Sequence, residues 1–201
     1  MSKIQTTEPP VLSHVEIDST VNRLEYEVQE IKRRIAELRR ARPVEDVKDY
    51  SFAHWSGASV PIADLFETKD TLLIVHNMGI SCSYCTMWAD GLNGLFPHLS
   101  DRTAFVLISP DEPAAQKVFA EGRGWRFPVY SASRTSFIED MGFFHKTEGL
   151  MPGVSALQKT RGKIVRVARA EFGPGDDFCA TWHLFDLLPG GAEGWSPKNV
   201  Y

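Results

Sequence analysis

The hydrophobic pattern divides the chain into two regions near Pro43. Before Pro43, apolar residues recur in alternating steps of four and three, the heptad spacing of an amphipathic helix, at Ile17, Val21, Leu24, Val28, Ile31, Ile35 and Leu38. This helix should end at Arg42, because a residue that precedes proline avoids helical backbone angles. We therefore predict a polar tail and a long N-terminal helix over residues 1–42, and a separate domain over residues 43–201.

The heptad pattern has two interpretations. With Val21, Val28 and Ile35 at the a positions, leucine and isoleucine occupy the d positions, a combination compatible with a two-stranded coiled coil. An amphipathic helix that packs on its own domain explains the same pattern equally well. The sequence thus leaves open whether this helix forms a homodimer.

After Pro43 the pattern changes to short strands that alternate with helices. The apolar runs at residues 72–76 and 103–108 predict central strands, and residues 86–95 and 112–122 predict helices. Residues 154–158 and 163–167 should form a hairpin around Thr160-Arg161-Gly162. Shorter elements are expected at residues 49–52, 61–66, 127–130 and 136–142, with a last helix at 176–188. This order predicts an α/β domain whose mixed sheet is covered by helices on both faces.

The candidate chemistry lies where the first central strand passes through a turn into a helix, at Cys82-Ser83-Tyr84-Cys85. Two cysteines three residues apart at a helix start lie on nearly the same face and can form a disulfide. The partial positive charge of the helix N-terminus favours the thiolate, the attacking species in redox exchange. A Cys-x-x-Cys pair near a β-α-β pattern indicates a thioredoxin-like redox motif. Cys82, nearer the turn, is the predicted nucleophile, and Cys85 would resolve the mixed disulfide.

The composition limits the classes of partner and the compartment that we expect for this protein. The net charge of −4 and the pI near 5.9 give no reason to expect nucleic acid or an anionic membrane. The first residues lack the apolar core of a signal peptide, and no apolar run reaches transmembrane length. Three cysteines are too few for a disulfide scaffold. We therefore expect a cytoplasmic protein, where such a cysteine pair is more often catalytic or metal-binding than structural.

Other titratable residues are weaker candidates. A zinc site needs four ligands, and a second cysteine pair is missing, although Cys179 and His183 could contribute if the last helix folded back. We expect Cys179 to be a small core residue and His76 a packed or capping histidine. Asp90 could accept a proton from Cys85 or face solvent. The sequence predicts no metal and no cofactor.

The cysteine segment at residues 76–94 resembles the bacterial DUF899 family of thioredoxin-like predicted dithiol–disulfide oxidoreductases. Further matches are Gly124-Trp-Arg-Phe-Pro128, Pro152-Gly-Val-Ser155, residues 184–189 and the arginine-rich end of the N-terminal helix, so that the resemblance covers nearly the whole chain. It implies a thioredoxin-like fold and redox activity on a protein or small molecule that carries a disulfide or thiol.

In thioredoxin folds a cis-proline faces the cysteine pair and guides the substrate. Pro152 matches that position best, although Gly153 follows it where the strand would usually begin directly. We predict substrate binding by Pro152 together with Ser81 and Trp88, which flank the cysteines.

Residues 106–111 and 127–131 are also similar to the sheet order of peroxiredoxins, in which a Pro-x-x-x-Thr-x-x-Cys arrangement builds the peroxide pocket. That arrangement is missing before Cys82, and the nearby threonine, Thr86, follows the second cysteine. A dithiol–disulfide oxidoreductase is therefore the favoured prediction. A thiol-dependent peroxide reductase and a non-catalytic thioredoxin-like binding module are the alternatives.

Overall fold

A computed structural model describes residues 12–201, and the chain divides into two compact units between Arg42 and Pro43. Helix α1 (His14–Ala41) belongs to the first unit. Ser13 begins it with a capping box, because its hydroxyl accepts the Glu16 backbone N–H while the Glu16 carboxylate accepts the Ser13 N–H. The predicted heptad helix is thus confirmed, while the predicted tail lies almost wholly outside the described residues.

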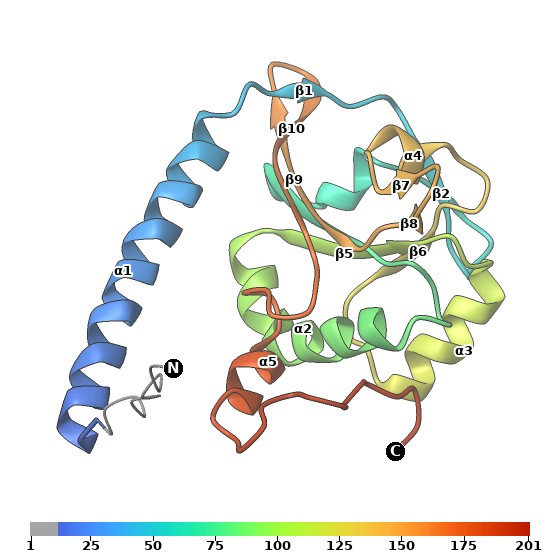
Figure 1. Cartoon of the computed structure of the whole chain (residues 1–201). Coiled ribbons are helices and arrows are strands. Elements are labelled where there is room, and N and C mark those ends of the chain that lie inside the picture. Colours follow the sequence, from blue (N-terminus) through green and yellow to red (C-terminus); the bar gives the residue numbers. More distant parts are fainter. Residues whose placement is uncertain (1–11) are drawn as a thin grey trace. The chain divides into compact units, whose positions relative to one another are not determined.

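The second unit contains a mixed sheet (Figure 1), whose eight strands within residues 12–201 have the order β1-β10-β9-β4-β5-β6-β2-β3. Strands β4 (Thr71–His76), β5 (Ala104–Ser109) and β6 (Val129–Ser131) run parallel, and the hairpin β9 (Gly153–Thr160) and β10 (Lys163–Glu171) continues the sheet antiparallel beside β4. The remaining strands are short: β1 (Glu45–Asp46), β2 (Ser51–Ala53), β3 (Ser59–Pro61) and a separate pair, β7 (Phe144–His145) and β8 (Gly149–Leu150).

Helices cover both faces of this sheet (Figure 1). On one face lie α2 (Ser83–Arg102), α3 (Pro113–Arg123) and α5 (Ala180–Phe185), and on the other lie the short η1 (Asp64–Phe66) and α4 (Phe137–Asp140). Alternate strand residues supply the two cores: Ile74 of β4 packs with Phe137, whereas Val75 packs with Trp88. This confirms the predicted thioredoxin-like α/β class with a preceding long helix.

Two details of the chain's second half refine the prediction. The hairpin turns at Arg161 and Gly162, which have φ angles of 48° and 78°, as a two-residue hairpin turn requires. Helix α5 is shorter than the predicted segment at 176–188, because Asp176 accepts the backbone N–H groups of Gly173 and Phe178 and forms a turn instead. Among the described residues, no helix is both long and apolar enough to cross a membrane.

Candidate active site

The cysteine pair follows the carboxyl end of β4, after a loop over residues 77–81. Three hydrogen bonds fold this loop: Asn77 N–H donates to the Ile108 carbonyl (2.9 Å), Gly79 N–H to the Asn77 side chain (2.8 Å), and Cys82 N–H to the Gly79 carbonyl (3.0 Å). The loop therefore turns within a few residues and presents Cys82 at the start of α2.

Gly79 is required for this turn. Its φ of 112° lies in a region that side chains rarely adopt, and an added Cβ would be 3.0 Å from a carboxylate oxygen of Asp111. Asp111, which follows β5, accepts the Ile80 N–H (3.1 Å) and the Ser109 hydroxyl (2.7 Å). The neighbouring parallel strand thus holds the cysteine loop in position.

The two cysteines have different surroundings although one helical turn separates them. Cys82 is the N-cap of α2, is partly exposed, and accepts the Cys85 backbone N–H at its Sγ (3.1 Å). Cys85 is only 3% exposed, and its Sγ accepts the Met78 N–H (3.5 Å). Both thiols are free in this structure. The Cys82 sulfur is therefore accessible from solvent, and the Cys85 side chain is buried.

These surroundings shift the two thiol pKa values in opposite directions. A hydrogen bond from the Cys85 thiol, aided by the backbone N–H groups of Cys85 and Tyr84 and opposed by burial, lowers the pKa of Cys82 to about 7. The same contact with Cys82, together with burial, raises the pKa of Cys85 far above its usual range. At pH 7 about half of the Cys82 side chains are therefore thiolate, while Cys85 stays protonated, so the negative charge lies on the accessible sulfur.

The three residues predicted to bind substrate occupy different environments. Ser81 is exposed directly before Cys82. Pro152 lies one residue beyond the paired residues His76 and Gly153, at the same end of the sheet as the cysteine loop. No peptide bond in the described part of the chain is cis, so Pro152 differs in this respect from the cis-proline of thioredoxin folds to which it was matched.

Trp88, by contrast, is a core residue. It is 2% exposed, it packs in the core beneath α2, and its indole N–H donates to Asp176 (3.3 Å). This burial argues against the predicted role of Trp88 in substrate binding. A direct contact between Trp88 and a substrate at Cys82 would require the core to open.

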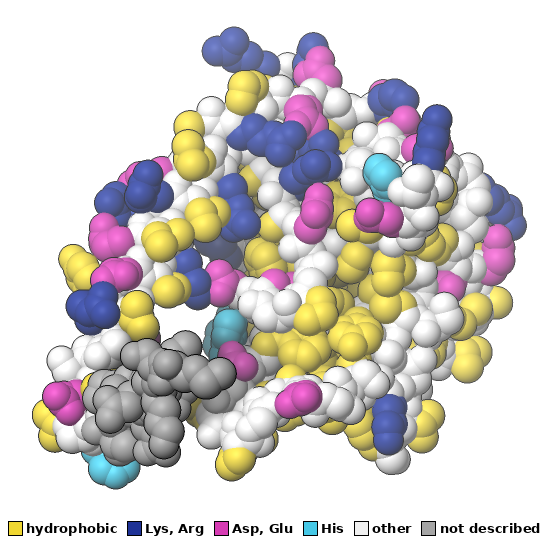
Figure 2. All heavy atoms as spheres, viewed as in Figure 1, with side chains coloured by type: hydrophobic (Ala, Val, Ile, Leu, Met, Phe, Trp, Pro, Cys, Tyr) yellow, Lys and Arg dark blue, Asp and Glu magenta, His cyan; other side chains and the backbone are white. Residues whose placement is uncertain are grey.

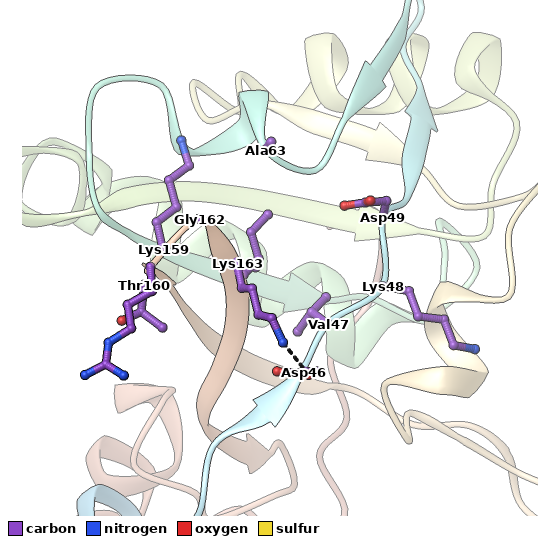
Figure 3. Close-up of a pocket in the computed structure, with 11 residues that line it drawn as sticks. Asp46, Val47, Lys48, Asp49, Ala63, Lys159, Thr160, Gly162 and Lys163 are labelled. Atoms are coloured by element: carbon purple, nitrogen blue, oxygen red, sulfur yellow. Dashed lines mark hydrogen bonds and ion pairs between the residues drawn. The ribbon is translucent and has the colours of Figure 1, made fainter.

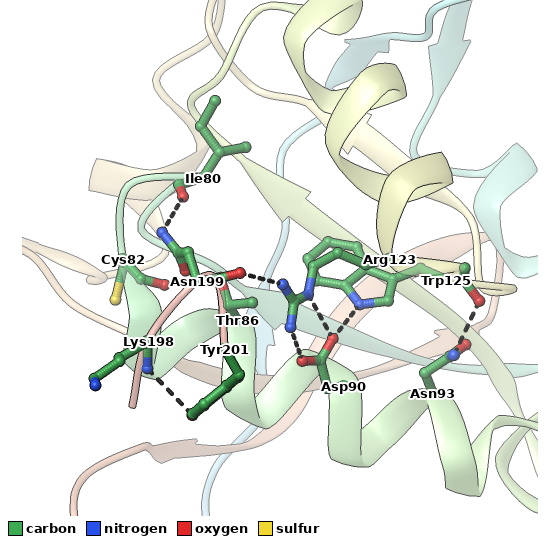
Figure 4. A network of polar contacts seen from close by, with 11 residues as sticks. Ile80, Cys82, Thr86, Asp90, Asn93, Arg123, Trp125, Lys198, Asn199 and Tyr201 are labelled. Carbon is green, nitrogen blue, oxygen red and sulfur yellow. Dashed lines mark hydrogen bonds and ion pairs between the residues drawn. The ribbon is translucent and has the colours of Figure 1, made fainter. Parts of the chain in front are cut away.

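The sequence left Asp90 as either a proton acceptor for Cys85 or a solvent-facing residue; in the structure its side chain is 37% exposed and forms an ion pair with Arg123. Its carboxylate accepts hydrogen bonds from the side chains of Arg123 and Trp125, at the end of α3 and just beyond it (Figure 4). Arg123 in turn donates to the backbone carbonyl of Asn199 (2.9 Å), and the Asn199 side chain donates to the carbonyl of Ile80 (3.2 Å). This chain of contacts ties the C-terminal segment to the cysteine loop.

The C-terminal segment is the part of the site that the sequence analysis missed. Figure 4 shows Asn199 beside the start of α2, near Cys82. Lys198 and Tyr201 stabilise the end of the segment through a hydrogen bond from the Lys198 backbone N–H to the Tyr201 hydroxyl (3.2 Å). No local sequence signal indicates this contact, because Ile80 and Asn199 are 119 residues apart.

The other titratable candidates are packed away from the thiols. His76 is buried, stacks on Phe143 and has its Nε2 within 2.9 Å of the Ser155 hydroxyl, as expected for a packed histidine. Burial lowers its pKa well below the usual value. Cys179 is 6% exposed in the core beneath α2, whereas His183 is exposed on α5. Within residues 12–201, no three His, Cys, Asp or Glu side chains are grouped as metal ligands.

A groove of about 600 Å³ lies elsewhere, between the segment at residues 46–49 and the β9–β10 turn (Figure 3). An ion pair between Lys163 and Asp46 (3.4 Å) crosses it, and its lining carries charges of both signs. Neither Cys82 nor Cys85 lines it, so the thiol site and this groove are separate features.

The family model described as "Bacterial protein of unknown function (DUF899)" matches residues 7–199. The chain belongs to the DUF899 family. This confirms the resemblance carried by the cysteine segment, and the match extends over both units of the chain. No curated protein matches the sequence.

Solved structures similar to this DUF899 protein are peroxiredoxins. Peroxidoxin BcpB from Mycobacterium tuberculosis is 19% identical with a TM-score of 0.54, covering 63% of this chain and 83% of that one. PrxQ from Xylella fastidiosa is 12% identical with a TM-score of 0.55 over the same shares. Reduced Prx3 from Vibrio vulnificus, solved with hydrogen peroxide, is 14% identical with a TM-score of 0.51, covering 66% and 88%. These likenesses establish the fold.

Proposed function

We propose that this DUF899 protein is a dithiol–disulfide oxidoreductase that uses Cys82 and Cys85. The observation that carries the proposal is the asymmetry of the pair: a partly exposed Cys82 whose pKa is lowered to about 7, directly in front of a buried Cys85. A reactive thiolate backed by a protonated thiol is the arrangement that thiol–disulfide exchange requires.

In the reducing direction the Cys82 thiolate attacks one sulfur of a substrate disulfide. The substrate S–S bond breaks, a mixed disulfide with Cys82 forms, and the leaving sulfur takes a proton. Cys85 then loses its proton to solvent or to the departing sulfur and attacks the Cys82 sulfur, which releases the second substrate thiol. The protein ends with a Cys82–Cys85 disulfide, and the substrate has gained two electrons from the protein and two protons, one originating from Cys85 and one from solvent. The oxidising direction is the reverse of these steps.

The substrate in this proposal is a protein or small molecule with an accessible disulfide or thiol. Ser81 and Pro152 are the proposed contacts, because Ser81 is exposed beside Cys82 and Pro152 lies at the same end of the sheet.

Single-cysteine variants test the proposal. We expect the wild-type protein to reduce a chromogenic aromatic disulfide when a dithiol is supplied, and Cys82→Ser to abolish this activity. Cys85→Ser should instead accumulate a mixed disulfide on Cys82, visible by mass spectrometry as an adduct that dithiothreitol removes. Cys179→Ser is the matched control, since this thiol is buried in the core. Absence of exchange in the wild type, or identical behaviour of the two variants, would refute an exchange mechanism.

The peroxiredoxin fold of the solved neighbours favours a second candidate, reduction of a peroxide. The Cys82 thiolate would attack one peroxide oxygen, break the O–O bond and become a sulfenic acid while water or an alcohol leaves. Cys85 would then condense with the sulfenic acid, releasing water and forming the disulfide. Against it, Val75 and Gly79 stand where the peroxidatic motif has proline and threonine. Hydrogen peroxide consumption at the background rate by the reduced protein would exclude this reaction.

If neither disulfide nor peroxide oxidises the pair, a non-catalytic binding module is the remaining interpretation. Its test is direct: the Cys82→Ser variant would then retain every interaction of the wild-type protein. The exchange and peroxidase hypotheses both require that variant to be inactive.

A further inference from the structure

We propose that helix α1 pairs with α1 of a second copy of this chain, in antiparallel orientation. The apolar residues at its a and d positions form a continuous seam, defined as Ile17, Val21, Leu24, Val28, Ile31, Ile35 and Leu38. α1 has no buried residue, and the seam residues are between 41% (Ile35) and 72% (Leu38) exposed. Figure 2 shows apolar side chains along this helix with charged side chains of both signs around them.

The charges that flank the seam favour a second copy of this chain as its binding partner. The e and g positions are acidic in the first half of α1, at Asp18, Glu25 and Glu27, and basic in the second half, at Lys32, Arg34 and Arg39. A helix whose two halves carry opposite charge is complementary to its own reversed copy. Charges at e and g positions set the partner and the orientation in coiled coils.

One antiparallel alignment of the two helices packs the seam residues against each other and also pairs the flanking charges. In this alignment each a residue packs against a d residue of the second copy. Val21 then lies opposite Leu38 of the second copy, and Val28 lies opposite its Ile31. The same register pairs Asp18 with Arg39, Glu25 with Lys32 and Glu27 with Arg34, and symmetry repeats each pair. Every charged e or g residue then faces an opposite charge.

A parallel pair of α1 helices would have less favourable charge contacts. In that orientation a g residue meets the e residue of the next heptad, so that Glu27 would face Lys32 favourably. Arg34 would face Arg39 of the second copy, a like-charge contact, and Asp18 would have no basic partner. The sign pattern therefore selects the antiparallel orientation over the parallel one.

The helix is long enough to form a coil by itself. Its 28 residues span about 42 Å, or four heptads. The capping box at Ser13 and the basic last turn stabilise its two ends, so neither end depends on a partner. The exposed contacts within the helix, such as Arg23 with Glu27 (2.6 Å), contribute little energy and can be exchanged for contacts across the dimer.

The first experiment measures the mass of the full chain in solution, by sedimentation or light scattering. We expect the wild type to be a dimer and Leu24→Glu combined with Ile31→Glu to be a monomer. Tyr26→Glu is the matched control, because Tyr26 lies at an f position on the opposite side of the helix. Far-ultraviolet circular dichroism checks that the domain remains folded. A wild type that is monomeric at all accessible concentrations overturns the proposal and favours packing of α1 on its own domain.

The second experiment tests the charges. Glu25→Lys with Glu27→Lys makes the flanks of α1 basic, and Lys32→Glu with Arg34→Glu makes them acidic. We expect each double variant alone to be mainly monomeric and an equal mixture of the two to form a heterodimer. Increasing salt should reduce the difference in dimer content between the single-variant samples and the mixture. If both double variants form dimers as stable as the wild type, the charges do not direct assembly and the proposal fails.

The third experiment tests orientation in a chain that carries Cys82→Ser and Cys85→Ser. Val21→Cys combined with Leu38→Cys should oxidise to a covalent dimer whose disulfide joins position 21 of one chain to position 38 of the other, as peptide mapping after proteolysis would show. Disulfides between two equivalent positions would establish a parallel pair and overturn the antiparallel assignment. These readouts measure assembly and not activity, so they are independent of the proposed redox reaction.

Discussion

Two cysteines of this protein occupy the same position at the start of a helix but differ in exposure and in the hydrogen bonding of their sulfur. Cys82 is the N-cap of α2 and Cys179 is the N-cap of α5, both with extended backbone angles. Cys82 accepts a backbone N–H at its sulfur and is partly exposed, whereas Cys179 makes no side-chain capping hydrogen bond and is 6% exposed in the core.

A helix N-terminus alone therefore does not distinguish the proposed nucleophile, Cys82, from Cys179. At Cys82 a hydrogen bond from the Cys85 thiol and the backbone N–H groups of Cys85 and Tyr84 lower the pKa against the opposing effect of burial, and partial exposure leaves the sulfur accessible. Cys179 lies instead in the core that contains Trp88 and Trp182, and it fills space as a small apolar side chain. Reactivity at the first cysteine therefore depends on features that substitutions can remove one at a time.

The largest expected contrast is between the alkylation rates of these two cysteines. At pH 7 about half of Cys82 should be thiolate, compared with about 3% for an ordinary cysteine of pKa 8.5. We expect iodoacetamide to label Cys82 roughly tenfold faster than a cysteine in a model peptide, with half-maximal rate near pH 7 and faster labelling at higher pH. Cys179 should be labelled only after unfolding. Time-resolved mass spectrometry of the peptides measures both, and comparable labelling of Cys82 and Cys179 in the native protein would contradict this contrast.

The second contrast isolates the contribution of Cys85. Cys85→Ala removes the thiol that lowers the pKa of Cys82, so the Cys82 pKa should rise and its alkylation at pH 7 should slow by about two- to fivefold. Cys85→Ser is the matched control, since its hydroxyl can still donate a hydrogen bond. The pH dependence of alkylation checks this, and an unchanged midpoint in Cys85→Ala would mean that the helix alone sets the pKa.

A third substitution changes the loop and leaves both thiols in place. Gly79→Ala forces a side chain into a positive φ and toward Asp111, and we expect a loss of about 1 kcal/mol or more in the free energy of unfolding. Exchange activity should fall with it because Cys82 follows this turn. Gly91→Ala is the control, since Gly91 lies on α2 with open space around it and should gain stability. Equal effects on chemical denaturation would argue against a strained turn.

The smallest expected effect concerns the C-terminal segment. Asn199→Ala removes the hydrogen bond to the Ile80 carbonyl, worth about 0.5–1.5 kcal/mol, and should change Cys82 alkylation by about twofold through a looser loop. Lys198→Ala, which keeps the backbone hydrogen bond to Tyr201, should leave the rate unchanged. Hydrogen exchange of residues 78–82 would show whether the loop loosens in the first variant only.

The sequence predicted most of the helices and longer strands, because each has a local signal. The apolar run of β4, the cysteine spacing and the heptad seam of α1 are all readable within a few residues. The hairpin of β9 and β10 was equally clear from its turn residues. The very short strands β1, β7 and β8 have only two residues each, too few for any periodicity to be visible.

The surroundings of two residues at the site depend on side-chain direction and on distant partners. Trp88 follows Cys85 by three residues, and with Leu92 and Phe96 it belongs to the inner stripe of α2, so its burial had a signal in the helical spacing. Asp90 had none, since its partners Arg123 and Trp125 are brought to it by the packing of α3 against the sheet. Contacts of that range follow from the fold and not from local pattern.

The opposite pKa shifts of the two thiols have an electrochemical consequence. Each proton that accompanies the two electrons of reduction changes the reduction potential by about 30 mV per pH unit. Below pH 7 reduction of a Cys82–Cys85 disulfide would take up two protons, but above the Cys82 pKa of about 7 it would take up only one, because Cys85 alone binds a proton. In mildly alkaline solution the voltage of this couple should therefore respond to acidity only half as steeply as that of two ordinary thiols.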